Sequence, residues 1–208
     1  MTGESSIVCV PPIFSFQEWV CPLWTTSPPH PSDYNTLMTS LIPTGAAAPD
    51  FTLPDLQGVH HTLSYQRGQI VILNFWSAEC PACERVDQDL AVLLPAWPSS
   101  VRLWYLASNV NEPLALLLAA SAQRRVSPVL QDTGHKIADL YGAITTPQFF
   151  VIDPKGRLQY QGTLDDRTFR QRTAKRFYLK DAVEALLQGD LPPVPETPSY
   201  GCTIVRSY

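Results

Sequence analysis

Apolar residues in the middle of the chain follow two spacings, one typical of buried strands and one typical of helices. Residues 69–75 contain a continuous apolar run rich in β-branched side chains, which predicts a strand buried on both faces of a sheet. Residues 83–94 carry apolar side chains at helical spacing, and Pro95 ends that pattern. A buried strand that leads into an amphipathic helix is typical of a parallel βαβ unit.

The rest of the central region continues this alternation. The pattern predicts strands at 101–107, 129–131, 148–152 and 158–161, and helices at 112–124, 136–141 and 175–187. The turn residues 153–156 join the last two strands as a hairpin, and Gly189 is placed to close the last helix. Parallel units followed by a hairpin indicate an α/β fold with a central mixed sheet flanked by helices.

Both ends of the chain are rich in proline and lack periodicity. We therefore expect residues 1–45 to form a loosely ordered arm, residues 46–188 to form the domain, and residues 189–208 to form a flexible tail. Because Met38 opens a segment that runs smoothly into the domain, one hypothesis is that residues 1–37 are not native. An N-terminal peptide from the native protein would decide this.

Composition limits the function classes. Apolar residues make up 45% of the chain and charged residues 16%, which indicates a globular protein. A net charge of -4 and the lack of any basic run argue against a nucleic-acid partner. The most continuous apolar stretch, 114–122, is too short to span a bilayer, and no signal sequence is readable. We expect a cytoplasmic monomer without a membrane span.

The strand-to-helix junction carries the candidate chemistry, Cys80-Pro81-Ala82-Cys83. Backbone N–H groups and the dipole at a helix N-terminus favour a thiolate, so the pKa of Cys80 is expected to fall. Cys80 would then attack a disulfide, and Cys83, one turn away, would resolve the mixed disulfide. This chemistry needs no tightly bound cofactor.

Zinc binding is the competing interpretation of a Cys-x-x-Cys pair. A structural zinc ion requires four ligands, and no second pair of this kind follows. The remaining candidates, His60, His61, His135 and Cys202, have no ligand spacing, so the sequence predicts no metal site. His60 and His61 fall in an expected hairpin, where a structural role for one inward-facing ring is favoured.

Residues 74–83, Asn-Phe-Trp-Ser-Ala-Glu-Cys-Pro-Ala-Cys, resemble the active-site segment of redoxins of the alkyl hydroperoxide reductase/thiol-specific antioxidant (AhpC/TSA) family. Residues 48–53 and 58–68 resemble the first strand and the hairpin of that family, so the resemblance covers about 46–188. It implies a thioredoxin-like fold with an N-terminal β-hairpin extension, an antioxidant or redox-homeostasis role, and protein disulfides, dithiols or peroxides as partners.

The resemblance also implies roles for residues around the dithiol. Thr146-Pro147 resembles the loop whose cis-proline lies opposite the dithiol and pairs with substrate, although an ordinary trans turn is the alternative. Trp76 and Pro81 would present a surface to the partner, while core packing is an equal alternative for Trp76.

Two departures from related patterns leave alternatives open. Thioredoxins place a buried Asp where this chain has Asn74, so Glu79 is the nearest carboxylate for proton transfer, unless it is only a solvated side chain. Peroxiredoxins carry a Pro where this chain has Leu73, although Ser77 fits their pattern, so peroxidase activity is the second choice. A non-catalytic binding module is the third. The combination of Asn-Phe-Trp with Cys-Pro-x-Cys resembles the membrane-associated or periplasmic reductases of the family, so a periplasmic location is the alternative to a cytoplasmic one.

Three cysteines lie outside the pair. Cys202 in the predicted tail is either a third redox thiol that docks on Cys80 or an exposed bystander. Cys9 and Cys21 receive no role.

Overall fold

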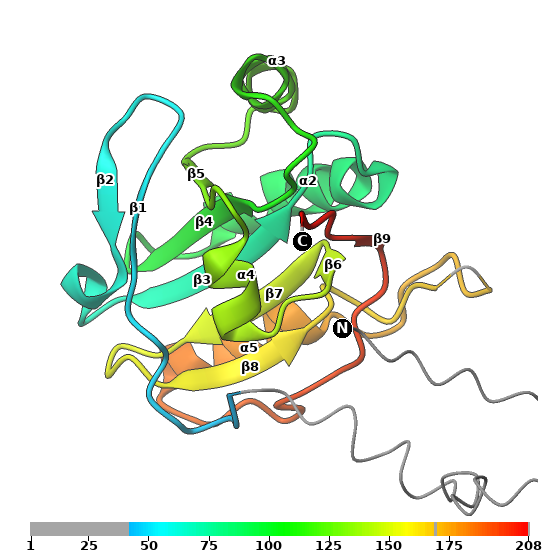
Figure 1. The fold of residues 1–208 in the computed structure, drawn as a ribbon. Helices are drawn as coiled ribbons and strands as arrows, with labels where there is room; N and C mark the ends of the chain where they lie inside the picture. The colour runs from blue at the N-terminus through cyan, green and yellow to red at the C-terminus, as the bar shows by residue number, and fades with distance from the viewer. Residues whose placement is uncertain (1–41, 169, 208) are drawn as a thin grey trace, which may run out of the picture. The chain divides into compact units, whose positions relative to one another are not determined.

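The fold is built on one mixed sheet, seen in a computed structural model that describes residues 42–168 and 170–207. The strand order is β5-β4-β3-β7-β8, in which β3 runs parallel to β4 and antiparallel to β7 (Figure 1). The strands are β3 (Ile70–Trp76), β4 (Val101–Ala107), β5 (Val129–Gln131), β7 (Gln148–Ile152) and β8 (Leu158–Gly162). The predicted α/β class with a thioredoxin-like mixed sheet is confirmed.

Strand β3 lies at the centre of the sheet, and all of its side chains are buried. Ile70, Ile72 and Trp76 pack on one face with side chains of helices α2, α3 and α5. Val71 and Leu73 point to the opposite face and pack with residues of α4. The alternation explains the continuous apolar run in the sequence, because helices cover both faces of the sheet.

Helices α2 (Pro81–Leu93), α3 (Leu114–Arg124), α4 (Lys136–Tyr141) and α5 (Tyr178–Gln188) complete the layers, with short 3-10 turns η1 (Leu63–Gln66) and η2 (Leu94–Ala96). Two predicted helix starts were wrong. α3 begins after Pro113, which has an extended ψ of 155° and lies outside the helix. α5 begins only at Tyr178, because the backbone N–H groups of residues 175 and 176 bind the Asp166 carboxylate instead.

The N-terminal hairpin consists of β1 (Thr52–Pro54) and β2 (His60–Thr62), as expected. Asp55 shapes its turn by accepting hydrogen bonds from two backbone N–H groups and from His61. His60 is exposed and His61 is half-buried, as the hairpin pattern indicated. Ile42 is buried in the core, so the ordered domain extends before residue 46. The hypothesis about residues 1–37, and Cys9 and Cys21, lie outside the described residues.

The C-terminal segment differs from the predicted flexible tail. Strand β9 (Cys202–Thr203) pairs antiparallel with β6 (Thr145–Thr146), just before Pro147. Figure 1 shows this red segment running alongside the carboxyl end of the central sheet, next to β6. Of the helices in the described residues, none is long and apolar enough to cross a membrane.

Candidate active site

The dithiol lies between the end of the central strand β3 and the start of helix α2. Cys80 is the N-cap residue of α2, with an extended backbone (φ -84°, ψ 117°), and Pro81 occupies the first helical turn. Proline suits this position because the first N–H groups of a helix have no intrahelical partner. Cys83 follows within the first turn, and the Cys80 and Cys83 side chains are only 1% and 0% exposed.

The two sulfurs have opposite acidities. The thiol of Cys83 donates a hydrogen bond to Cys80, and this bond, with others from the backbone N–H of Cys83 and from Cys202, lowers the pKa of Cys80 to about 4. Burial raises the pKa of Cys83 well above its ordinary value, and the bond to Cys80 adds to the effect. These shifts make Cys80 a thiolate and Cys83 a thiol at neutral pH.

The loop opposite the dithiol comes within contact of it. The peptide bond between Thr146 and Pro147 is cis, as expected. The carbonyl oxygen of Thr146 lies 3.1 Å from Sγ of Cys80, which donates to it in the thiol form. The structure thus brings together Cys80, Pro81, Cys83 and the Thr146-Pro147 loop.

Cys202 reaches the same place from the C-terminal strand. It lies opposite Thr146 in the β6–β9 pair, its thiol and backbone N–H donate hydrogen bonds to Cys80, and the backbone N–H of Ala82 donates to its sulfur. The Cys202 side chain is nevertheless exposed to solvent. Cys202 thus lies beside Cys80, and its role as a redox thiol stays a prediction.

A buried acid group lies behind the dithiol. Asp87 follows Cys83 by one helical turn and is 4% exposed. Its Oδ2 accepts a hydrogen bond of 3.0 Å from the indole of Trp76 and lies 3.5 Å from the guanidinium of Arg124. Burial raises the pKa of Asp87 to about 6 against these two contacts. Its Oδ1 has no hydrogen-bond partner in the described part of the chain.

A second carboxylate holds the segment before Cys80. Glu112, in the loop between β4 and α3, accepts hydrogen bonds from Ser77 Oγ (2.5 Å), Ala78 N (3.2 Å), Glu79 N (3.3 Å) and Asn109 Nδ2 (3.1 Å). Arg124 secures the same segment by donating to the carbonyl oxygens of Ser77 and Ala78. These bonds fix the backbone that leads into the dithiol.

Two sequence-based roles change in the structure. Trp76 is fully buried and packs in the core, so it offers no surface to a partner. Glu79 is exposed and accepts a hydrogen bond from Asn111, which is the solvated alternative. The amide of Asn74 is fully buried, and neither of its polar atoms has a partner among the described residues. A buried acid group lies on α2 instead, at Asp87.

A profile of the AhpC/TSA family matches residues 44–161. The chain belongs to the AhpC/TSA family. It is 34% identical over 131 residues to the thiol-disulfide oxidoreductase ResA of Geobacillus thermodenitrificans, a match that covers 61% of this chain and 74% of ResA.

Two solved structures extend the likeness of this AhpC/TSA protein. A hypothetical protein from Sinorhizobium meliloti 1021 is 29% identical, with a TM-score of 0.71 over 80% of this chain and 96% of that one. An uncharacterized conserved protein from Geobacillus kaustophilus is 26% identical, with a TM-score of 0.74 over 81% and 95%.

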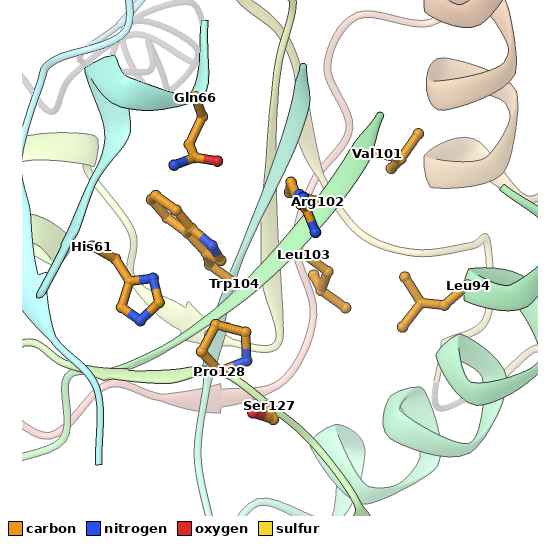
Figure 2. Close-up of a pocket in the computed structure, with 9 residues that line it drawn as sticks. All are labelled: His61, Gln66, Leu94, Val101, Arg102, Leu103, Trp104, Ser127 and Pro128. Atoms are coloured by element: carbon orange, nitrogen blue, oxygen red, sulfur yellow. The ribbon is translucent and has the colours of Figure 1, made fainter. Parts of the chain in front are cut away.

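The AhpC/TSA domain also has a pocket of about 420 Å³ away from the dithiol. Figure 2 shows the residues that line it: His61, Gln66, Leu94, Val101, Arg102, Leu103, Trp104, Ser127 and Pro128. The His61 and Trp104 rings form a T-shaped pair there, with centroids 5.6 Å apart. No residue of the dithiol or of the C-terminal strand lines this pocket.

In the described part of the chain, no three His, Cys, Asp or Glu side chains are grouped to hold a metal ion.

Three residues of the site were not predicted from the sequence: Asp87, Glu112 and Arg124. A signal existed for Asp87, because an acidic residue one turn after Cys83 interrupts the apolar face of a helix. Glu112 and Arg124 gave no local signal, since their partners lie about 33 to 47 positions away in the chain.

Proposed function

We propose that this protein is a thiol-disulfide oxidoreductase whose chemistry is carried by Cys80 and Cys83. The observation that carries the proposal is the pairing of the two sulfurs at the start of α2. A hydrogen bond from Cys83 lowers the pKa of Cys80 to about 4, while burial raises the pKa of Cys83. One sulfur is thus prepared to attack, and its neighbour keeps its proton until it is needed.

The proposed reaction proceeds through one mixed disulfide. Sγ of Cys80 attacks a sulfur of the partner disulfide, a bond forms between them, and the second partner sulfur leaves as a thiolate that takes a proton from solvent. Cys83 then loses its proton and attacks Sγ of Cys80. The Cys80–Cys83 bond forms, the first partner sulfur leaves, and two electrons have passed to the partner. The same steps in reverse oxidise a partner dithiol.

We infer that Asp87 accepts the Cys83 proton. The two residues lie on one face of α2, and the charge of Asp87 is near enough to raise the pKa of Cys83. With a pKa of about 6, Asp87 is ionised at neutral pH and can accept a proton from a thiol whose pKa falls as the Cys80 charge is lost in the mixed disulfide. Glu79, the carboxylate that the sequence suggested for proton transfer, is exposed and bonds Asn111 instead.

A polypeptide disulfide or dithiol is the partner class that we favour. The pairing of β6 with β9 beside Cys80 illustrates that an extended segment containing a cysteine fits there, and a partner segment would take this place when β9 opens. Peroxide is the other substrate to test.

A cytoplasmic location and a monomeric state belong to the same proposal. Sedimentation analysis tests the monomeric state.

Insulin reduction by dithiothreitol tests the function. In a chain carrying Cys9→Ser and Cys21→Ser, we expect acceleration of insulin precipitation. Cys80→Ser should abolish the acceleration, and Cys83→Ser combined with Cys202→Ser should accumulate a mixed disulfide with insulin that mass spectrometry detects. The same preparations are tested with hydrogen peroxide and a thiol reductant. Lack of acceleration in the parent chain, or full acceleration in Cys80→Ser, would contradict the proposal, and rapid peroxide consumption alone would favour the peroxidase.

A further inference from the structure

The C-terminal segment is attached to the domain on both sides of Cys202. Before it, the backbone N–H of Thr197 donates to the carbonyl of Gln161 at 3.0 Å, and Gln161 N donates to the carbonyl of Pro195 at 3.1 Å. Thr145 Oγ1 bonds Ser199 Oγ at 2.9 Å. We call residues 195–207 the C-terminal strap.

The strap is anchored more strongly after Cys202. Ile204 is 2% exposed in the core, and its N–H donates to the carbonyl of Ile144 at 3.0 Å. The N–H of Val205 donates to Asn109 at 2.8 Å. Arg206 donates to Asp139 at 2.8 Å and to the carbonyl of Ala143 at 2.6 Å. Opening the strap would therefore break several hydrogen bonds and expose a buried apolar side chain.

A glycine lets the strap approach the dithiol closely. A Cβ atom on Gly201 would lie 2.0 Å from the carbonyl oxygen of Thr146, so no other residue fits there without a shift of the backbone. This contact seats the next residue, Cys202, against Cys80. The strap therefore covers Cys80, which is 1% exposed, and presents an exposed thiol in its place.

We propose that Cys202 is a third redox-active thiol, through which an external dithiol reduces the buried Cys80–Cys83 disulfide while the strap stays in place. The proposal rests on the function proposed above. Its basis is the contrast in access: Cys80 and Cys83 are buried, whereas Cys202 contacts Cys80 on one side and solvent on the other. A reductant that cannot reach the dithiol can reach Cys202.

The relay has three balanced steps. First, the Cys202 thiolate attacks Sγ of Cys80, the Cys80–Cys202 bond replaces the Cys80–Cys83 bond, and Cys83 leaves as a thiolate that takes a proton. Second, a reductant thiolate attacks Sγ of Cys202, and Cys80 leaves as a thiolate. Third, the second thiol of the reductant, as a thiolate, attacks the reductant sulfur that is bound to Cys202. Cys202 leaves and takes a proton. Two electrons have passed from the reductant to the dithiol, and the reductant has become a disulfide.

The acidities favour ionisation of Cys202 and the second step, whereas the raised pKa of Cys83 makes it a poor leaving group in the first step. Burial and the neighbouring Cys80 charge raise the pKa of Cys202 to about 11 in the reduced protein. When Cys80 is held in a disulfide it carries no charge, so the part of the rise in the Cys202 pKa that this charge causes is lost. In the second step Cys80 is the better leaving group, because hydrogen bonds from Cys83 lower its pKa and a thiol of low pKa leaves faster.

The first experiment looks for the intermediate. In a full-length chain with Cys9→Ser and Cys21→Ser, the added change Cys83→Ser leaves Cys80 and Cys202 as the only thiols. Mild oxidation with diamide should then give a Cys80–Cys202 disulfide, identified by mass spectrometry of a non-reduced digest. A further Cys202→Ser change is the control and should give no such peptide. Absence of the linkage in the first protein would overturn the proposal.

The second experiment measures the relay itself. The parent chain and its Cys202→Ser variant are oxidised, and reduction by dithiothreitol is followed by timed alkylation. A serine keeps the strap docked and retains a hydrogen-bond donor, so we expect reduction to slow by roughly tenfold or more, because the attacking sulfur is gone. An unchanged or faster rate would overturn the relay, and a faster rate would identify the strap as a plug. In either case, insulin reduction that still depends on Cys80 leaves the proposed function standing.

Discussion

The indole nitrogen of Trp76 donates a hydrogen bond of 3.0 Å to Oδ2 of Asp87, and both side chains are buried. Trp76 closes the central strand and Asp87 lies one turn beyond Cys83, so the bond joins the two elements that carry the dithiol. Arg124 lies over the Trp76 ring, 5.5 Å from its centroid, and pairs with the same carboxylate. These contacts orient an acid group behind the resolving thiol.

Asp87→Asn should slow the resolving step. Asparagine keeps the bond from the Trp76 indole but cannot accept a proton, so we expect release of the mixed disulfide to slow by about 10²-fold, as is usual for loss of a general base. The rise of the wild-type rate with pH near 6, from ionisation of Asp87, should disappear. Stopped-flow measurement of resolution across pH tests this. Glu79→Gln is the matched control, and an equal loss in that variant would contradict the role of Asp87.

The same carboxyl group should make stability depend on pH. Its folded pKa of about 6 is above the ordinary value of 3.8, so the native state favours the protonated form. The resulting stabilisation is fully present below pH 3.8 and is lost as pH rises through about 6. At ~1.4 kcal/mol per pKa unit, this amounts to about 3 kcal/mol.

Comparison with Asp87→Asn isolates this contribution from that of Cys80, whose lowered pKa acts in the opposite direction. We expect the free energy of unfolding of wild type, relative to Asp87→Asn, to fall between pH 4 and 7 in urea titrations. A constant difference over that range would show that Asp87 is not buried in the way described.

The sequence predicted the sheet well because its signals are local. β4, β5 and β7 have the predicted bounds, and a continuous apolar run marks β3 as a strand covered on both faces. The helix starts of α3 and α5 were less predictable, because a proline and a side-chain carboxylate decide them. The dithiol was predictable from its spacing together with its place between a buried strand and a helix.

The sequence did not predict that the C-terminal strap covers the dithiol. Strand β9 is only two residues long, so it has no periodicity, and its register depends on contacts with residues that precede it by about 57 positions. Glu112 was missed for the same reason, since its bonds to residues 77–79 cross the fold. Long-range polar contacts leave little trace in a single sequence.

Glu112→Ala should destabilise the protein and loosen the segment before Cys80. The change removes the acceptor for four donors, of which Ser77 Oγ and Ala78 N form bonds in a buried environment. We expect a loss of about 2–4 kcal/mol in the free energy of unfolding, because buried donors would lose their partner. Chemical denaturation measures it. Glu184→Ala, which removes only an exposed ion pair with Lys180, is the control and should cost at most about 1 kcal/mol. Equal losses in the two variants would contradict the role of Glu112.

Two substitutions at Cys202 should separate its hydrogen bond from its sulfur chemistry. The Cys202 thiol donates to Cys80, and this bond helps to lower the pKa of Cys80 to about 4. Cys202→Ala removes the donor while the strap stays anchored by Ile204 and Arg206, so the pKa of Cys80 should rise. Cys202→Ser supplies a hydroxyl donor, so the pKa should stay near the wild-type value.

Ultraviolet absorbance of the thiolate, recorded as a function of pH in the reduced proteins, measures this pKa directly. The thiolate signal of Cys80 should be complete at a lower pH in Cys202→Ser than in Cys202→Ala, with a separation of roughly one pH unit for a hydrogen bond worth ~1.4 kcal/mol. Reduction of the oxidised dithiol should be slow in both variants, since both lack the relay sulfur. Identical titrations of the two variants would show that Cys202 does not donate to Cys80, even if a disulfide between them forms.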